Sequence, residues 1–372
     1  MNLGRVRAIA GVAAGLGLVG TLIGAFTGEA SIWPSYLLAF LFCWGLASGA
    51  VALLLLHQLT AGGWGFLIQR PLEAAAKTMP LVLLMFVPVV VGMHDLYHWT
   101  HAEAVAADPL LQHKAPYLNT PFFIGRAAFY FVVWMGLTFA LVKWSSKPSR
   151  LQKISGIGLV IWVLTTTFAA FDWAMSLDPH WFSTIYGLLF VVGQGLGTLA
   201  FAIAVLFLLR GTDLDALLNT KRTHDLGKLL FAFVMLWGYM NLSQFIIIWY
   251  GNLPEEIVWY VHRTEHGYQG LTLAVVFLQF VIPFFALLSR KPKRRLGVLA
   301  SIALAILFVR LVDLFWLVMP GGLRPEAGVT IADISAPMML AGIWLLAFTF
   351  LLGQRPLLNR EDPRLEEVLH AH

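Results

Sequence analysis

Ten long apolar stretches alternate with short polar segments along the chain, and charged residues, glycine or proline bound each stretch. A helix of about 20 apolar residues crosses the hydrocarbon core of a membrane. The pattern predicts an all-α polytopic membrane protein whose ten-helix domain covers residues 1–354, with a polar tail at 355–372. We expect the transmembrane helices near residues 6–26, 36–57, 79–98, 120–142, 154–175, 184–209, 228–250, 268–289, 296–318 and 333–353.

Basic residues are distributed unevenly between the two sides that this helix count defines. The side that carries both termini holds 20 Lys and Arg residues, whereas the other side holds three, Lys114, Arg263 and Arg324. Because segments rich in Lys and Arg stay in the cytoplasm, we expect both termini to be cytoplasmic. The net charge of +5 therefore reflects topology and does not indicate a nucleic-acid partner.

Composition narrows the class of protein further. Only 12% of the residues are charged, about half the roughly 25% of soluble domains, and the mean hydropathy is +0.77, which together exclude an ordinary soluble enzyme. The single cysteine, Cys43, excludes an intrachain disulfide, a CxxCH haem attachment, a thiolate-ligated iron–sulfur cluster and a cysteine zinc site. The sequence thus predicts no covalently attached or thiolate-ligated redox centre in this chain.

Two features of the pattern concern the arrangement of the helices. Residues 64–78 indicate an interfacial stretch, with Trp64 and Arg70 at the depth of the lipid headgroups. Spans 2–5 and 6–9 suggest a parallel repeat, because spans 5 and 9 each place an aspartate beside aromatic residues, Asp172 and Asp313. We therefore expect two four-helix bundles with flanking helices.

Ionisable residues inside the predicted spans are few. A charged side chain at the centre of a transmembrane helix costs roughly 2.5–3.5 kcal/mol on insertion scales, so each such residue needs a partner or a water path. In the halves of the spans nearer the more basic side, His57 is the only ionisable residue. The other ionisable residues inside spans all lie toward the opposite side. These candidates for quinol binding or proton transfer are His94, Asp95, His98, Arg126, Asp172, Arg310 and Asp313.

Three histidines near the end of span 3 are spaced for one helix face. His94, His98 and His101 follow an i, i+4, i+7 pattern, and Asp95 lies within reach of His98. A carboxylate beside imidazoles suits a proton relay or a hydrogen-bonding site for a quinol hydroxyl. Three alternatives remain open. The residues are simply hydrated at the depth of the lipid headgroups, they form a single metal-binding histidine box, or His94 or His98 holds a bis-histidine haem together with His262 or His266. We assign no metal and no catalytic residue.

The two intramembrane arginines can pair with the two aspartates, either within a helix or across a bundle. Structural ion pairing is one interpretation, and a polar cavity open to the periplasm is the other. The loops on the less basic side are rich in Trp, Tyr and Pro, which favours a docking surface for a peripheral partner. Its candidate residues are His101, Asp178, His180, Glu255, Glu256, His262, Arg263 and His266.

Several runs resemble the F-type membrane component of bacterial alternative complex III, a membrane quinol:electron-acceptor oxidoreductase. This component is related to the polysulfide-reductase-type (NrfD-like) membrane subunits. The Asp-Trp-x-Met-Ser-Leu-Asp-Pro-His-Trp and Trp-Tyr-Gly-Asn-Leu-Pro-Glu-Glu runs are long and specific, and the resemblance covers roughly spans 3 to 9. The runs that carry it lie at residues 108–119, 171–183, 225–233 and 243–256.

The resemblance implies two four-helix bundles in the bacterial cytoplasmic (inner) membrane, surrounded by lipids. It also implies partners: a paralogous ten-helix membrane subunit, periplasmic multihaem cytochrome c subunits, and an iron–sulfur, molybdopterin-like peripheral subunit. Haem c and iron–sulfur clusters would belong to these partners, and a quinone such as menaquinone is the implied ligand of the complex. In this family quinol oxidation is usually assigned to the paralogue, and a proton-conducting role is proposed for the F-type component.

Three hypotheses follow from the sequence. The first is a subunit of a quinol-oxidising complex that contributes a periplasm-facing polar cavity for quinol or protons. The second is a scaffold that anchors the redox subunits without chemistry of its own, which a dry, tightly paired cluster would favour. The third is a secondary transporter, which predicts paired helix interruptions near the middle of the membrane.

Overall fold

The computed structural model describes residues 3–27, 32–359 and 361–365, so the last part of the predicted tail, 366–372, lies outside the described residues. These residues form helices and connecting loops, with no β-strand among them. The first half contains α1 (Leu3–Thr27), α2 (Trp33–Thr60), α3 (Gly63–Ala76), α4 (Met79–Val91), α5 (Met93–Leu96), α6 (Ala102–Ala107), α7 (Pro109–Lys114), α8 (Thr120–Lys143) and α9 (Pro148–Trp173). The second half contains α10 (Tyr186–Leu208), α11 (Thr220–Gly251), α12 (Pro254–Thr264), α13 (Gln269–Val275), α14 (Ile282–Leu288), α15 (Arg290–Arg294), α16 (Leu296–Val318) and α17 (Ile331–Leu352).

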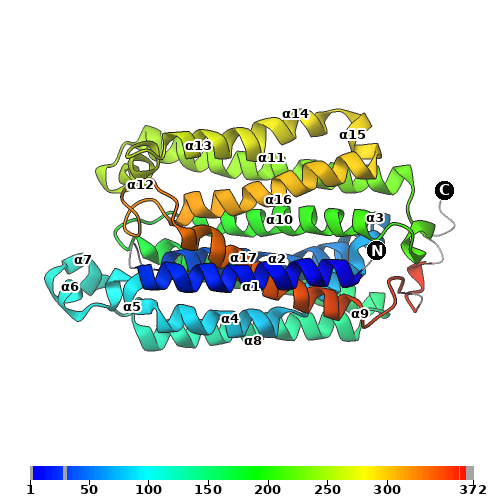
Figure 1. Ribbon diagram of the computed structural model, residues 1–372, viewed down its shortest axis with the longest axis horizontal. Helices are drawn as coiled ribbons and strands as arrows, with labels where there is room; N and C mark the ends of the chain where they lie inside the picture. The colour runs from blue at the N-terminus through cyan, green and yellow to red at the C-terminus, as the bar shows by residue number, and fades with distance from the viewer. Residues whose placement is uncertain (1–2, 28–31, 360, 366–372) are drawn as a thin grey trace.

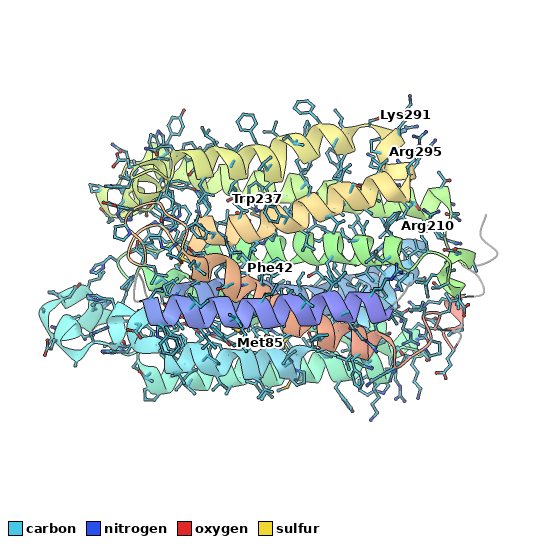
Figure 2. All side chains as sticks on the ribbon, in the orientation of Figure 1. Phe42, Met85, Arg210, Trp237, Lys291 and Arg295 are labelled. Carbon is cyan, nitrogen blue, oxygen red and sulfur yellow. The ribbon has the colours of Figure 1, made fainter. Side chains whose placement is uncertain are left out.

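The long helices lie side by side along the longest axis of the molecule (Figure 1). Nine of the described helices are long and apolar enough to span a membrane, and the count is ten if the bent pair α3–α4 is one span. The prediction of an all-α polytopic membrane protein is therefore confirmed. We call the end with α6, α7 and α12 the loop end (Figure 1), and the end with Arg210, Lys291 and Arg295 the basic end (Figure 2).

The helices form two four-helix groups with two flanking helices, as expected. The first bundle contains α2, α3–α4, α8 and α9, and the second contains α10, α11, α13–α14 and α16. α1 packs mainly on α17, which in turn packs on α2. α1 begins and α17 ends at the basic end, where Arg7 donates a hydrogen bond to the carbonyl of Thr349 (3.0 Å).

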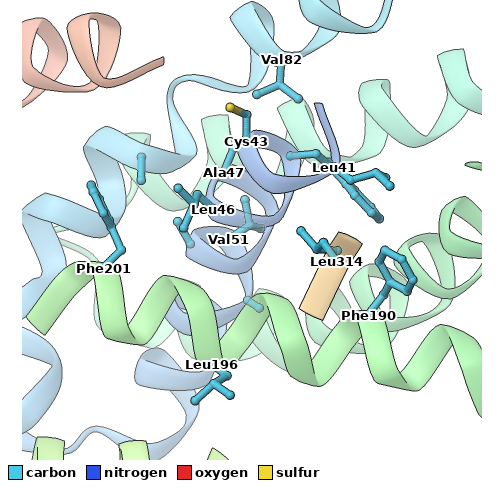
Figure 3. Packing of buried hydrophobic residues seen from close by; sticks show 14 of the residues in the cluster. Leu41, Cys43, Leu46, Ala47, Val51, Val82, Phe190, Leu196, Phe201 and Leu314 are labelled. Atoms are coloured by element: carbon cyan, nitrogen blue, oxygen red, sulfur yellow. The ribbon is translucent and has the colours of Figure 1, made fainter. Parts of the chain in front are cut away.

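The two bundles meet where α2 packs against α10, and small residues make this contact close. A Cβ atom on Gly49 of α2 would lie 2.3 Å from Thr198 Oγ1 and 2.6 Å from the carbonyl oxygen of Gln194. Thr198 donates back to the carbonyl of Gly45 (3.1 Å). Figure 3 shows Leu46 and Val51 of α2 beside α10 in this buried contact. Small residues are common at such helix crossings because they let the backbones approach closely. Van der Waals packing then stabilises the contact, since lipid provides no hydrophobic driving force for helices to associate.

Residues 64–78 do not form the interfacial stretch that the sequence suggests. They belong to α3, most of whose residues are buried against α2, α10 and α17. α3 and α4 are bent by 42° relative to each other, and the bend lies at Lys77 and Thr78, where Trp344 donates to Thr78 Oγ1 (2.8 Å). α3 and α4 count as one span, over residues 63–91, only if the bent pair crosses the membrane together, and α4 ends at Val91, before the histidines.

We expect Gly49→Ala to destabilise the protein by about 1–3 kcal/mol, because its methyl group overpacks the contact between the bundles. Gly136→Ala is the matched control, because nothing lies within 4 Å of a Cβ at Gly136, and alanine favours a helix over glycine by roughly 1 kcal/mol. Thermal unfolding in detergent compares the two variants with the wild type. Equal stability of the two variants would contradict a tight contact at Gly49.

Candidate functional site

Arg126 and Asp172 form a buried ion pair across the first bundle. The Asn119 side chain caps the start of α8 by accepting from the Phe122 N–H (3.0 Å), which places Arg126 two turns into the helix. Its guanidinium donates to both carboxylate oxygens of Asp172 at the end of α9, at 2.8 and 2.9 Å. Tyr130 donates to the same carboxylate (2.8 Å). The predicted pairing across the bundle is confirmed.

The Arg126–Asp172 ion pair is saturated with hydrogen bonds and surrounded by aromatic rings, of which the Tyr117 hydroxyl and the Trp173 indole N–H have no partner among the described residues. Arg126 also donates to the carbonyl of Tyr117 (2.8 Å), and its guanidinium lies 3.8 Å from the centre of the Tyr117 ring. Asp172 is fully buried, and the neighbouring Trp173 packs against Trp44 and Trp134. Since both carboxylate oxygens and the guanidinium already have partners, this cluster has the character of a structural ion pair.

Arg310 and Asp313 form the second buried ion pair, one turn apart on α16. Trp237 of α11 donates to the same carboxylate oxygen, Oδ2, at 3.1 Å. Glycine on α10 makes room for the arginine, because a Cβ on Gly193 would lie 2.4 Å from the guanidinium carbon. The in-helix pairing is therefore confirmed, and the glycine run of α10 serves helix packing.

Several buried polar atoms of the second bundle have no partner among the described residues. Oδ1 of the buried Asp313 accepts no hydrogen bond from the described residues, and neither amide atom of Gln194 or Gln279 has a partner among them. Gln194 and Arg310 line a cavity of about 10 Å³, which is about the space that one water molecule needs. Gln279 is fully buried in the π-helical segment Val276–Val281, a rare geometry that is frequent at functional sites.

The predicted helix face with three histidines is wrong. α4 ends at Val91, Tyr97 is extended, and His98–Thr100 form a separate 3₁₀ turn. Trp33 packs so closely on Gly92 that a Cβ there would lie 2.3 Å from the indole, and the buried Tyr97 turns inward to donate to the carbonyl of Trp173 (3.0 Å). Burial of these aromatic side chains redirects the chain.

The histidine segment is therefore outside the spans at the loop end. His94, Asp95 and His98 are exposed. The His94 and His101 rings stack with centroids 3.8 Å apart, and His101 Nε2 lies 2.8 Å from the carbonyl oxygen of His94. Asp95 and His98 make no hydrogen bond or ion pair with each other. Among the described residues, no group of three or more His, Cys, Asp or Glu side chains could hold a metal ion.

The remaining loop candidates are divided between surface and interior. His180 and Asp108 pair at 2.5 Å, which joins the α6–α7 loop to the loop after α9. This hydrogen bond is the main cause that holds the pKa of Asp108 below its usual range. Glu255, His180 and His266 are exposed, whereas Asp178, Glu256, His101 and His262 are half-buried.

Arg263 is not part of an exposed docking surface. It is 3% exposed, stacks on Trp259 with its guanidinium carbon 3.4 Å from the ring centre, and donates to the carbonyls of Trp316 (3.0 Å) and Leu317 (2.8 Å). These are free carbonyls at the end of α16, where a cation is favourable. Burial lowers the pKa of Arg263 to about 9, which still leaves it protonated at neutral pH.

Sequence reasoning missed two polar networks. At the basic end, the buried Glu73 accepts from Gln69 (3.1 Å) and pairs with Arg70, so His57 is not the only ionisable residue in that half of the spans. At the loop end, the Asp333 carboxylate accepts from Ser35 (2.7 Å) and pairs with Arg324 at 2.5 Å. The i, i+4 spacing of polar residues within α3 was the available indication of a buried network.

A second, apolar cavity lies at the loop end between α16, α17, α2 and α13. Its volume is about 770 Å³, and Asp333 and Tyr268 are its polar lining residues. Its other walls are apolar side chains, among them Phe42, Phe308 and Phe315. None of the residues predicted to bind quinol lines it.

Neither a scan of protein-family models nor a search of curated proteins found a match to this chain. The resemblance to alternative complex III therefore stays a prediction from the sequence.

We expect Arg126→Met to destabilise the protein by about 3–5 kcal/mol, because it leaves the buried Asp172 charge without its cation. Adding Asp172→Asn removes that charge while keeping an acceptor for Tyr130, so the double variant should recover a large part of the loss. Thermal unfolding in detergent measures both variants. A double variant no more stable than Arg126→Met alone would show that the cost does not come from an unpaired charge.

Proposed function

We propose that this membrane protein is a subunit of a quinol-oxidising electron-transfer complex of the alternative complex III type, and that its Arg310–Asp313 cluster transfers protons. Two observations support the proton role: Oδ1 of the buried Asp313 has no partner among the described residues, and its ion-pair partner Arg310 shares a water-sized cavity with the unpartnered Gln194. Quinol oxidation releases protons together with electrons, and the electrons would pass to redox centres in partner subunits.

The chemistry of the cluster suits proton transfer better than quinol binding. The cavity of about 10 Å³ has room for a water molecule but not for a quinol ring. Oδ2 of Asp313 is engaged by Arg310 and Trp237, whereas Oδ1 is available to accept a proton. Glutamine amides can both donate and accept hydrogen bonds. Gln194 can therefore orient water in the cavity that Arg310 lines, and Gln279 can do so where the π-helical segment packs on α16.

The saturated Arg126–Asp172 cluster supports a structural role for the first bundle, as the scaffold hypothesis expects. The transporter hypothesis receives less support. It requires interruptions in corresponding helices of the two halves, but the bend lies in span 3, at α3–α4, and the π-helical segment lies in span 8. Under the repeat of spans 2–5 and 6–9, these positions do not correspond.

We expect Asp313→Asn to slow quinol-linked proton release by at least about tenfold, because a positioned general base typically contributes that much or more. Gln279→Leu should slow it as well while leaving the ion pair intact, and Glu103→Gln, at an exposed position in α6, is the control. The intact complex in proteoliposomes, with a pH dye outside, measures the rate.

Two results would contradict this proposal separately. Wild-type proton release in both Asp313→Asn and Gln279→Leu would leave the cluster with a structural role. Purification of the tagged chain from its own membranes without haem c or iron–sulfur partners would remove the assignment to the complex.

Quinol binding by this chain itself is the second candidate function, and the apolar cavity of about 770 Å³ favours it, because its size falls within the roughly 300–1,000 Å³ of small-molecule sites. We expect Ala341→Phe, which fills this cavity, to abolish labelling of the chain by a photoreactive azidoquinone. Gly136→Phe on the outer surface of α8 should leave the labelling unchanged. Equal labelling of the two variants would exclude the cavity as a quinol site.

A further inference from the structure

A large cavity lies at the basic end, far from the Arg310–Asp313 cluster. Its volume is about 1150 Å³, above the roughly 300–1,000 Å³ typical of small-molecule pockets. It occupies the wedge between α8 and the bend of α3–α4, and the chain after α17 closes one side. Met135 lines it eight residues before Lys143, so the cavity extends about 12 Å along α8. We call it the basic-end cavity.

One wall of the basic-end cavity is apolar and continues onto the outside of the protein. Met79 and Pro80 of α4 face Met135, Phe139 and Val142 of α8 across it. Phe139 is 63% exposed, on the same outer surface of α8 as the exposed Phe129 and Val132. Because a long apolar helix exposes such a surface to lipid, the apolar wall is continuous with the hydrocarbon region of the bilayer.

Part of the lining of the cavity is basic. Its lining includes four basic side chains and two acidic ones, Asp213 and Glu361, which leaves a formal excess of two positive charges. Ser146 donates to the Glu361 carboxylate (3.0 Å). The basic side chains are Arg70, Lys77, Lys143 and Arg355.

Two of these cations have no ion pair within the part of the chain that the structure describes. Arg70 pairs with the buried Glu73, and Arg355 lies 4.0 Å from the same carboxylate. No ion pair among the described residues includes Lys77 or Lys143; the ammonium group of Lys143 lies 5.1 Å from the centre of the Phe139 ring. Lys77 is half-buried and Lys143 is exposed, so both ammonium groups are accessible, and basic residues at the membrane surface attract anionic lipid headgroups.

The basic lining residues and the apolar wall that continues to the lipid together favour a ligand that is both anionic and amphiphilic. A small polar anion would leave the apolar wall unfilled, and an apolar ligand would leave the lysines uncompensated. We propose that the basic-end cavity binds an anionic phospholipid, with its phosphate beside Lys77 and Lys143 and its acyl chains along the wall of α4 and α8. Basic pockets between transmembrane helices bind lipid headgroups in this way.

The test compares two double variants of the full chain that remove the same charge at the same end. Lys77→Gln with Lys143→Gln removes the cations of the cavity, whereas Lys147→Gln with Lys221→Gln removes two basic residues that do not line it. The delipidated proteins are titrated with phosphatidylglycerol, and bound lipid is counted by native mass spectrometry. A basic residue beside an anionic lipid contributes about fivefold in affinity, so the Lys77→Gln, Lys143→Gln variant should bind the lipid about 25-fold more weakly, and the Lys147→Gln, Lys221→Gln variant should bind it like the wild type.

Two further measurements on the wild-type protein distinguish a lipid headgroup from free phosphate as the source of the anion. Phosphatidylcholine should bind the wild type far more weakly than phosphatidylglycerol, and inorganic phosphate alone should neither raise its unfolding temperature nor displace the lipid. Equal affinity of the two double variants, equal binding of the two lipids, or displacement by free phosphate would each overturn the proposal. The comparison of lipids uses only the wild-type protein and therefore does not depend on the folding of any variant.

Discussion

The close contact between α2 and α10 is the constraint on which the rest of this structure depends. Gly49 brings the backbone of α2 against Gln194 and Thr198 of α10, and this joins the two bundles. The neighbouring face of α10 also needs small residues, since a side chain at position 193 would collide with Arg310 of α16. Small residues on two adjacent faces of α10 thus position the bundle contact and the buried charge together.

The two buried ion pairs show how similar residues acquire different chemical character. Both aspartates lie toward the loop end of their bundle, and each is paired with an arginine and a second donor. In the first bundle the arginine comes from a neighbouring helix and binds both carboxylate oxygens, so neither oxygen of Asp172 lacks a partner. In the second it comes from the same helix and engages one oxygen only, because an i, i+3 partner approaches the carboxylate from one side. The geometry of the donor, more than the type of residue, decides whether a carboxylate is saturated.

The long helices could be predicted from the sequence because a bilayer demands about 20 apolar residues per span. The arginine–aspartate pairs could be predicted as well, since a charge inside a span needs a partner. The break after Val91 could not, because it depends on Trp33 and Tyr97, whose packing partners are distant in the sequence. The burial of α3 was also hidden, since its Glu73 and Arg70 compensate each other's charge and look like surface residues in isolation. Helix periodicity alone therefore placed the histidines on a face that does not exist.

The π-helical segment Val276–Val281 has a consequence for how the second bundle can change over time. A π-helical turn accommodates one residue more than the α-helix around it, so the segment is equivalent to a single inserted codon. Deletion of that codon would return the helix to regular spacing while α13 and α14 kept their own faces. Deletion of the Gln279 codon itself would remove the buried amide in the same genetic step.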